Sequence, residues 1–125
     1  MSKTILMTGA ALLAFAVAVG AFGAHALKVR LTDDMLQIYK TGVEYHFYHA
    51  LGLLLIGVLS LHISSGLLNW SALLLVLGIV LFSGSLYLLA ITGLKWLGAI
   101  TPLGGLSFIA GWILLLIAVW KNLPR

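Results

Sequence analysis

The sequence predicts an all-α integral membrane protein: an up-and-down bundle of four transmembrane helices in one domain over residues 1–125. Hydrophobic residues make up 62% of the chain and charged residues only 8%, whereas charged residues form about 25% of an ordinary soluble domain. Four apolar segments cover about 5–27, 43–61, 70–91 and 100–120. Each is close to the ~20 residues with which a helix crosses a bilayer, and a helix satisfies its own backbone polar groups.

The few charged residues stand near the ends of the apolar segments. This placement is typical of anchoring at lipid headgroups, so we expect the lipid bilayer, and not nucleic acid, as a partner. Basic residues do not predict an orientation, because they are balanced between the side of the termini (Lys3, Lys121, Arg125) and the other side (Lys28, Arg30, Lys40, Lys95). The absence of cysteine excludes disulfides, thiol catalysis and thiolate metal sites.

The first apolar segment has two interpretations. Lys3 and the motif Ala-His-Ala at 24–26 resemble a signal peptide with its cleavage site. The apolar run is longer than the ~7–15 residues usual for such peptides, which favours a retained span. Its small residues lie on two helical faces, and small residues allow helices to approach closely, within the chain or between copies. One face holds Ala11, Ala14, Ala18, Ala21 and His25, and the other holds Gly9, Ala16, Gly20 and Gly23. An exposed Gly9/Ala16/Gly20 face would favour a homo-oligomer.

The connection at 28–40 is the main polar segment. Thr32, followed by Asp33 and Asp34, is a typical helix start, with a hydroxyl N-cap and acidic residues at the positive end of the helix dipole. We therefore predict a short amphipathic helix at the membrane interface between spans one and two, with a bend near Gly42. A solvated loop is the alternative.

Unusual polar residues gather in one half of the membrane. The antiparallel topology places the segments 20–27, 44–49, 83–87 and 101–105 at the same depth. The candidate polar cluster consists of His25, Glu44, Tyr45, Tyr48, His49, Ser83, Ser85, Tyr87 and Thr101. It predicts either a binding site or hydrogen bonds that hold the helices together. Thr101 also suits the N-cap of the fourth span, ahead of Pro102.

Glycines in the same segments predict close helix packing, because a missing side chain lets two backbones approach. The candidates are Gly20, Gly23, Gly84, Gly104, Gly105 and Gly111.

Three functions are compatible with these residues. The leading hypothesis is a non-enzymatic scaffold or accessory protein that binds a membrane protein partner, a lipid or its own copies, without a cofactor. A second is a cofactor, quinone or metal binder that uses His25 and His49, although two histidines are fewer than the ligands of a usual zinc site. A third is a small proton or solute transporter that uses Glu44 and His49, which would need polar groups in the other half of the membrane too. Common catalytic motifs are absent from the sequence.

The polar and glycine-rich motifs resemble those of the domain-of-unknown-function family number 423. They read GAFGAHAL at 20–27, YHFYHAL at 45–51, FSGSLY at 82–87 and GAITPLGG at 98–105, with GW at 111–112. Bacterial members of this family are small inner-membrane proteins, and a eukaryotic relative is called transmembrane protein 256. The resemblance implies a multi-pass protein of the bacterial cytoplasmic membrane whose first span is retained. One departure is His46, which stands where relatives carry Gln, so a ligand role is not expected for it. The family implies no activity.

Overall fold

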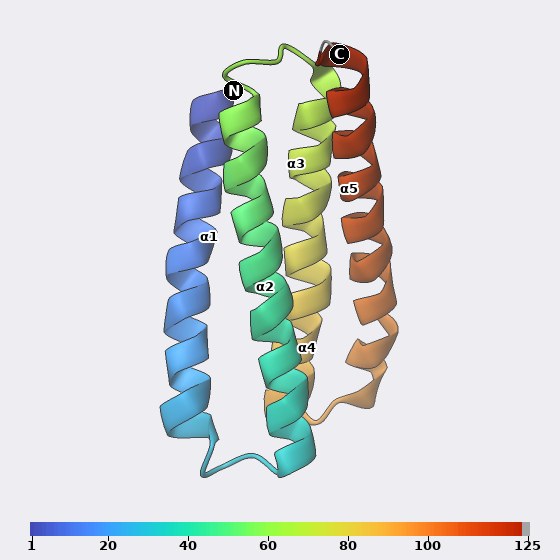
Figure 1. The fold of residues 1–125 in the computed structure, drawn as a ribbon. Coiled ribbons are helices and arrows are strands. Elements are labelled where there is room, and N and C mark those ends of the chain that lie inside the picture. Colours follow the sequence, from blue (N-terminus) through green and yellow to red (C-terminus); the bar gives the residue numbers. More distant parts are fainter. Residues whose placement is uncertain (124–125) are drawn as a thin grey trace.

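A computed structural model describes residues 1–123 and confirms an all-helical bundle of four spans (Figure 1). The first span is α1 (Ser2–Phe22) with a π-helical end at Gly23–Leu27, and the second is α2 (Asp33–Leu59). The third comprises α3 (Gly66–Gly78), a π-helical segment at Ile79–Ser83 and α4 (Gly84–Thr92). A 3-10 turn at Lys95–Ala99 leads into the fourth, α5 (Thr101–Asn122). The basic anchor expected at Arg125 lies outside the described residues.

Consecutive spans run in opposite directions, and the start of α1 and the end of α5 lie at the same end of the bundle (Figure 1). α1 packs along α2, and α3 packs along α5. α2 also contacts α3 and α4, so it is the element that joins the two helix pairs. The first span is the least enclosed of the four, since only 17% of the residues in its apolar stretch are buried.

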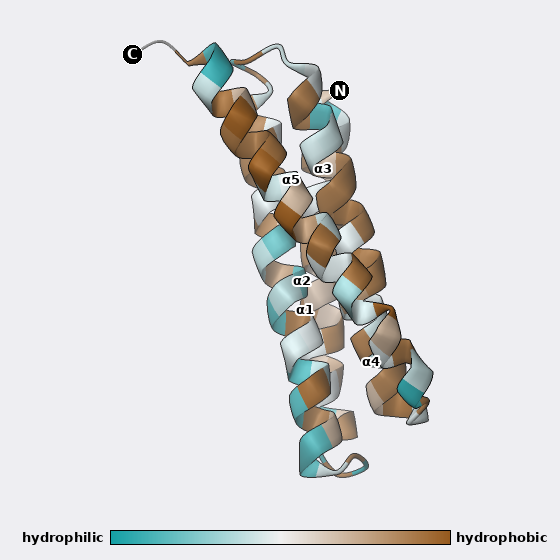
Figure 2. Ribbon diagram, turned by 90° about the vertical axis from the view of Figure 1, so that its right-hand side faces the viewer, coloured by the Kyte–Doolittle hydropathy of each residue, from teal (hydrophilic) through white to brown (hydrophobic). Residues whose placement is uncertain are grey.

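Apolar side chains fill the half of the bundle nearest the termini. Leu53 and Ile56 of α2 meet Leu68 and Leu75 of α3 there, and all four are fully buried. The other half holds a smaller apolar cluster around Leu27, together with the buried hydroxyls of Ser83 and Ser85. Figure 2 shows hydrophobic residues over most of the bundle, with hydrophilic residues at its two ends and in its lower half.

The separate interfacial helix expected at 28–40 is a wrong prediction, because α2 runs as one uninterrupted helix from Asp33 to Leu59. The predicted start is confirmed: the hydroxyl of Thr32 accepts a hydrogen bond from the Met35 amide at 3.3 Å. The first turns of α2 bury one face, formed by Leu36, Tyr39 and Gly42. This face packs into the bundle, so the segment continues the second span instead of lying along the membrane surface.

A polar layer between the helices

A buried hydrogen bond joins the second and third spans. The ring Nδ1 of His46 lies 2.9 Å from the hydroxyl of Tyr87, and His46 is only 1% exposed. The ring of Phe15 in α1 lies 5.9 Å from the same imidazole, centroid to centroid. Nε2 of His46 nevertheless has no hydrogen-bond partner within residues 1–123. The imidazole thus lies between three helices, with one nitrogen bonded and one enclosed without a partner.

The pair of His46 and Tyr87 belongs to a polar layer between the helices. Tyr39 extends this layer toward the connection between the first two spans. Its hydroxyl donates to the carbonyl oxygen of Val19 in α1, and its ring lies 5.1 Å from the ring of Tyr87, centroid to centroid. A Cβ added to Gly23 would overlap the Tyr39 ring. Glycine at position 23 is therefore required for Tyr39 to reach α1, and Tyr39 connects α1 to the pair formed by His46 and Tyr87.

Ser83 holds α2 against the π-helical segment of the third span. Its hydroxyl is fully buried and donates to the Gly42 carbonyl at 2.7 Å. A Cβ on Gly42 would come within 2.9 Å of the Tyr87 ring. The π-helical segment ends at Ser83, and such an irregular turn changes which residues face the neighbouring helix. Local geometry and close packing together create this contact.

Ser85 and Thr101 join the third span to the start of the fourth. Their hydroxyl oxygens are 2.7 Å apart, and Ser85 also lies 2.9 Å from the Phe82 carbonyl. The expectation that Thr101 caps α5 is wrong, because the N-cap is Ile100 and has no side-chain bond. Thr101 is the first residue of the helix, and its hydroxyl is directed to Ser85 instead.

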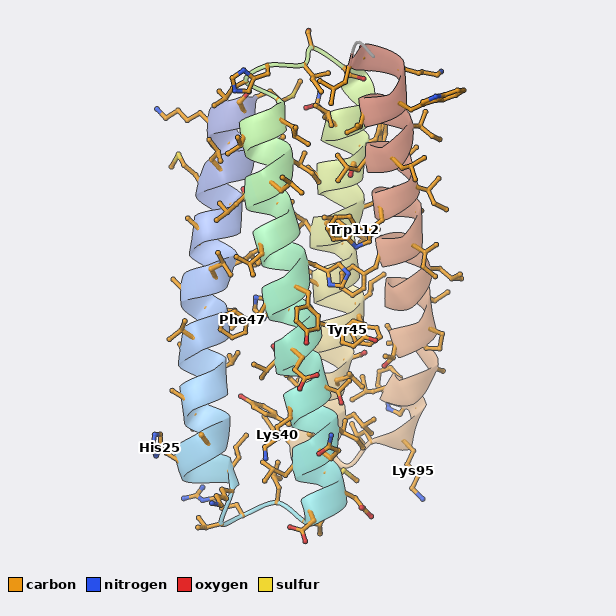
Figure 3. All side chains as sticks on the ribbon, in the orientation of Figure 1. His25, Lys40, Tyr45, Phe47, Lys95 and Trp112 are labelled. Atoms are coloured by element: carbon orange, nitrogen blue, oxygen red, sulfur yellow. The ribbon has the colours of Figure 1, made fainter. Side chains whose placement is uncertain are left out.

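His49 faces the gap between α2 and α5, where Tyr45 and Trp112 also lie (Figure 3). Its Nδ1–H donates to the Tyr45 carbonyl at 2.6 Å, since a carbonyl only accepts. Its ring stacks on Phe108 with centroids 3.4 Å apart. His49 is 6% exposed, so it is a packed side chain of an aromatic cluster.

Three of the predicted cluster residues do not join the layer. His25 is exposed and points away from the other helices (Figure 3). His25 stands two residues after Gly23, and Gly23 packs against Tyr39 of α2. Tyr39 comes ten residues before His49, which corresponds to about 15 Å along the helix. The expected pair of His25 and His49 is therefore wrong, because the bundle places the two rings at different depths. Glu44 and Tyr48 are also exposed.

The six predicted packing glycines differ in their surroundings. A Cβ at Gly104 would lie 2.7 Å from the Cβ of Phe82, and one at Gly111 would lie 2.8 Å from Leu75. Gly23 is closed by Tyr39, as described above, and Gly20 is in ordinary contact with Val43 at 3.4 Å. Close packing is a wrong expectation for Gly84, which has nothing within 4 Å, and for Gly105, whose nearest neighbour is 3.9 Å away.

Sequence reasoning missed several residues that fasten the spans. The sequence does not single out Tyr39, and it sets His46 aside as a ligand. The structure shows that both belong to one buried face of α2, together with Leu36 and Gly42 at helical spacing. Ser71 donates to the Gly111 carbonyl and Ser107 to the Leu74 carbonyl, each at 2.7 Å. A lone serine inside a hydrophobic segment is the available signal, because its hydroxyl needs a partner there. Within residues 1–123, no three His, Asp or Glu side chains gather as metal ligands would.

Comparison with known proteins agrees with this architecture. A family model described as "Protein of unknown function (DUF423)" matches residues 19–105. A UPF0382 membrane protein of Staphylococcus haemolyticus is 49% identical over 119 residues, which cover 95% of this chain and 97% of that protein. The UPF0382 membrane protein YwdK of Bacillus subtilis is 48% identical over 122 residues, covering 97% of this chain and 99% of that protein. No solved structure matches the chain. The chain therefore belongs to the DUF423 family and is a multi-pass protein of the bacterial cytoplasmic membrane.

Proposed function

We propose that the protein is a non-enzymatic scaffold or accessory protein of the membrane, which binds another membrane component through its outer surface. The observation that carries this proposal is the set of hydrogen bonds that the buried hydroxyls donate to neighbouring helices. Ser71, Ser83 and Ser107 each donate to a backbone carbonyl of another span. Their hydrogen-bonding capacity therefore contributes to helix association, which is the common role of such groups in membrane bundles.

The other two functions have weaker support. A shared cofactor or metal on His25 and His49 conflicts with the different depths of the two rings. A transport path would have to cross the apolar half of the bundle, where Leu53, Ile56 and Leu75 are fully buried. The polar layer would line such a path only in its own half of the bundle and not in the apolar half.

Association with a further helix would use the outside of α1. Gly9 and Ala16 face α2 and are buried, so the face that the sequence suggested for a homo-oligomer is occupied within the chain. The opposite face, which includes Ala14 and Ala18, is exposed. We therefore propose that a second copy of the chain or another membrane protein would contact this outer face.

Stability and flux measurements on the same variant test the proposal. Ser83→Ala removes one buried bond, and we expect the free energy of unfolding in detergent to fall by about 0.5–1.5 kcal/mol. Ser64→Ala, at an exposed turn position, should leave it unchanged. Proteoliposomes loaded with a pH-sensitive dye should leak protons no faster with the protein than without it. A proton flux that disappears in His46→Gln would overturn the scaffold function in favour of transport.

A further inference from the structure

A cleft opens between α1 and α3 in the half of the bundle nearest the termini. Its volume is about 620 Å³, within the ~300–1,000 Å³ range of small-molecule sites. Leu53 of α2 forms part of the lining between the two helices, with Ile5 and Thr8 from α1 and Ala72 and Val76 from α3. Most of these side chains are apolar, so the cleft suits a hydrocarbon chain.

The cleft continues into a more polar hollow at the end of the bundle. This second hollow has a volume of about 300 Å³, and Met1 and Asn69 line both spaces. Ser60, Ser64 and Ser65 belong to the polar hollow alone. The combined space therefore changes from apolar within the membrane to polar at its edge. An amphipathic lipid has the same gradient along its length.

Three polar side chains that line the cleft have no partner. Thr4, Thr8 and Asn69 form no side-chain hydrogen bond within residues 1–123, unlike the buried Ser71, two residues after Asn69 in α3. Thr8 lies about 9 Å along the helix from Ser2, within the first membrane-spanning segment. Unpaired polar groups are costly at that depth. A bound molecule with oxygen acceptors there, such as the ester carbonyls of a glycerolipid, would satisfy them.

Charge favours an anionic headgroup at this end. Lys3 stands in the sequence between Ser2, which lines the polar hollow, and Thr4, which lines the cleft. The helix α3 begins at Gly66, which also lines the polar hollow, so the positive end of its dipole lies there. The three acidic side chains of the chain, Asp33, Asp34 and Glu44, belong to the opposite half of the bundle (Figure 1). A phosphodiester with net negative charge would therefore meet attraction here, with no Asp or Glu side chain of residues 1–123 at this end of the bundle.

We propose that this cleft binds one anionic diacyl glycerophospholipid. The phosphate occupies the polar hollow near Lys3, the ester carbonyls accept hydrogen bonds from Thr4 and Asn69, and one acyl chain lies along Leu73 and Val76. This site goes beyond the scaffold function, because none of its residues belongs to the polar layer of His46, Tyr87 and Ser83. Either proposal can therefore fail without the other.

Native mass spectrometry of the full chain, released from nanodiscs, tests the headgroup. With phosphatidylglycerol and phosphatidylcholine of identical acyl chains, we expect one phosphatidylglycerol retained per chain and several-fold weaker retention of phosphatidylcholine. Lys3→Gln should weaken phosphatidylglycerol retention by about fivefold. Lys95→Gln, the same charge change at the other end of the bundle, should leave it unchanged. Equal retention of the two lipids, or equal effects of the two variants, would overturn the proposal.

The polar side chains that line the cleft, which we call its polar wall, are tested with Asn69→Leu. This change removes the amide but keeps a side chain of similar size. Because Asn69 bonds to nothing in residues 1–123, we expect its unfolding midpoint to stay near that of the wild type while lipid retention falls several-fold. Unchanged retention would show that the wall does not contact lipid. Glycerophosphoglycerol, the headgroup without acyl chains, should not displace the bound lipid; displacement at equal concentration would identify a soluble phosphate site instead.

Photolabelling of the unmodified protein keeps the test independent of any variant. Phosphatidylglycerol with a diazirine near the middle of one acyl chain should label the peptide that contains Ala72 and Val76. It should label the exposed lipid-facing side of α5 at Ile109 and Ile113 less often. Equal labelling of the two surfaces would mean ordinary annular lipid. A crosslink between two copies through the cleft, without bound lipid, would assign the cleft to a second copy of the chain.

Discussion

Nδ1 of His46 and the hydroxyl of Tyr87 lie 2.9 Å apart in the interior of the bundle and connect α2 to α4. The pair separates the roles of two neighbouring histidines. His46 bonds across helices, whereas His49 bonds to the backbone of its own helix through the Tyr45 carbonyl. The interhelical contact thus depends on a residue that the sequence motif did not single out.

Tyr87→Phe should lower the free energy of unfolding by about 1–2 kcal/mol, because it leaves both nitrogens of the buried His46 ring without a partner. Reversible unfolding in a denaturing detergent, followed by circular dichroism, measures this loss. Tyr48→Phe is the matched control, since Tyr48 is 57% exposed, and it should unfold like the wild type. The double variant Tyr87→Phe/His46→Leu should cost less than the sum of the single changes. Additive losses would mean that the two side chains do not interact.

Gly104→Ala should destabilise the bundle by about 1–3 kcal/mol, because the new Cβ would meet the backbone of Phe82, which cannot move without shifting the third span. Gly84→Ala is the control in a neighbouring segment. Nothing lies within 4 Å of its added Cβ, and alanine is the better helix former by up to about 1 kcal/mol. Thermal unfolding of the two variants should therefore shift in opposite directions. A tolerated Gly104→Ala would show that the two spans are further apart than described.

The two faces of α1 should respond differently to a large side chain. At Gly9 an added Cβ already lies 2.9 Å from the side chain of Leu54 and 3.2 Å from its backbone nitrogen, so Gly9→Ile should separate α1 from α2 and lower the unfolding midpoint. Ala14 is exposed, and Ala14→Ile should leave the midpoint of the monomer unchanged. Crosslinking in membranes then tests the outer face. If α1 associates with another copy there, Ala14→Ile should reduce the crosslinked dimer; a dimer insensitive to Ala14→Ile would place the contact elsewhere.

Labelling of single-cysteine variants tests the continuity of α2, and the natural chain offers no competing thiol. A cysteine in place of Leu36, which is 9% exposed, should react slowly with a water-soluble maleimide. A cysteine in place of the adjacent, exposed Gln37 should react fast. A helix that lay along the membrane surface would not bury Leu36 between helices. Fast labelling at both positions would contradict the continuous helix and favour a solvated connection.

The sequence by itself determined the class of this protein. Four hydrophobic segments without interior charge have one stable form in a bilayer, and short connections make them antiparallel. The helix start at Thr32 was also predictable, because an N-cap is a local interaction with the next turn. The family followed from the motifs themselves.

Only the tertiary structure decided which polar residues meet. Whether His46 or His49 forms a hydrogen bond to another helix depends on the rotation of α2, and residues three positions apart on one helix differ in direction by about 60°. The packing of Tyr39 against Gly23 and the π-helical turn before Ser83 set that rotation and the matching face of the third span. These are contacts between distant parts of the chain, so the hydrophobic periodicity of a single segment does not predict them. The same structure leaves His25 exposed, outside the polar layer, although it stands only two residues after Gly23.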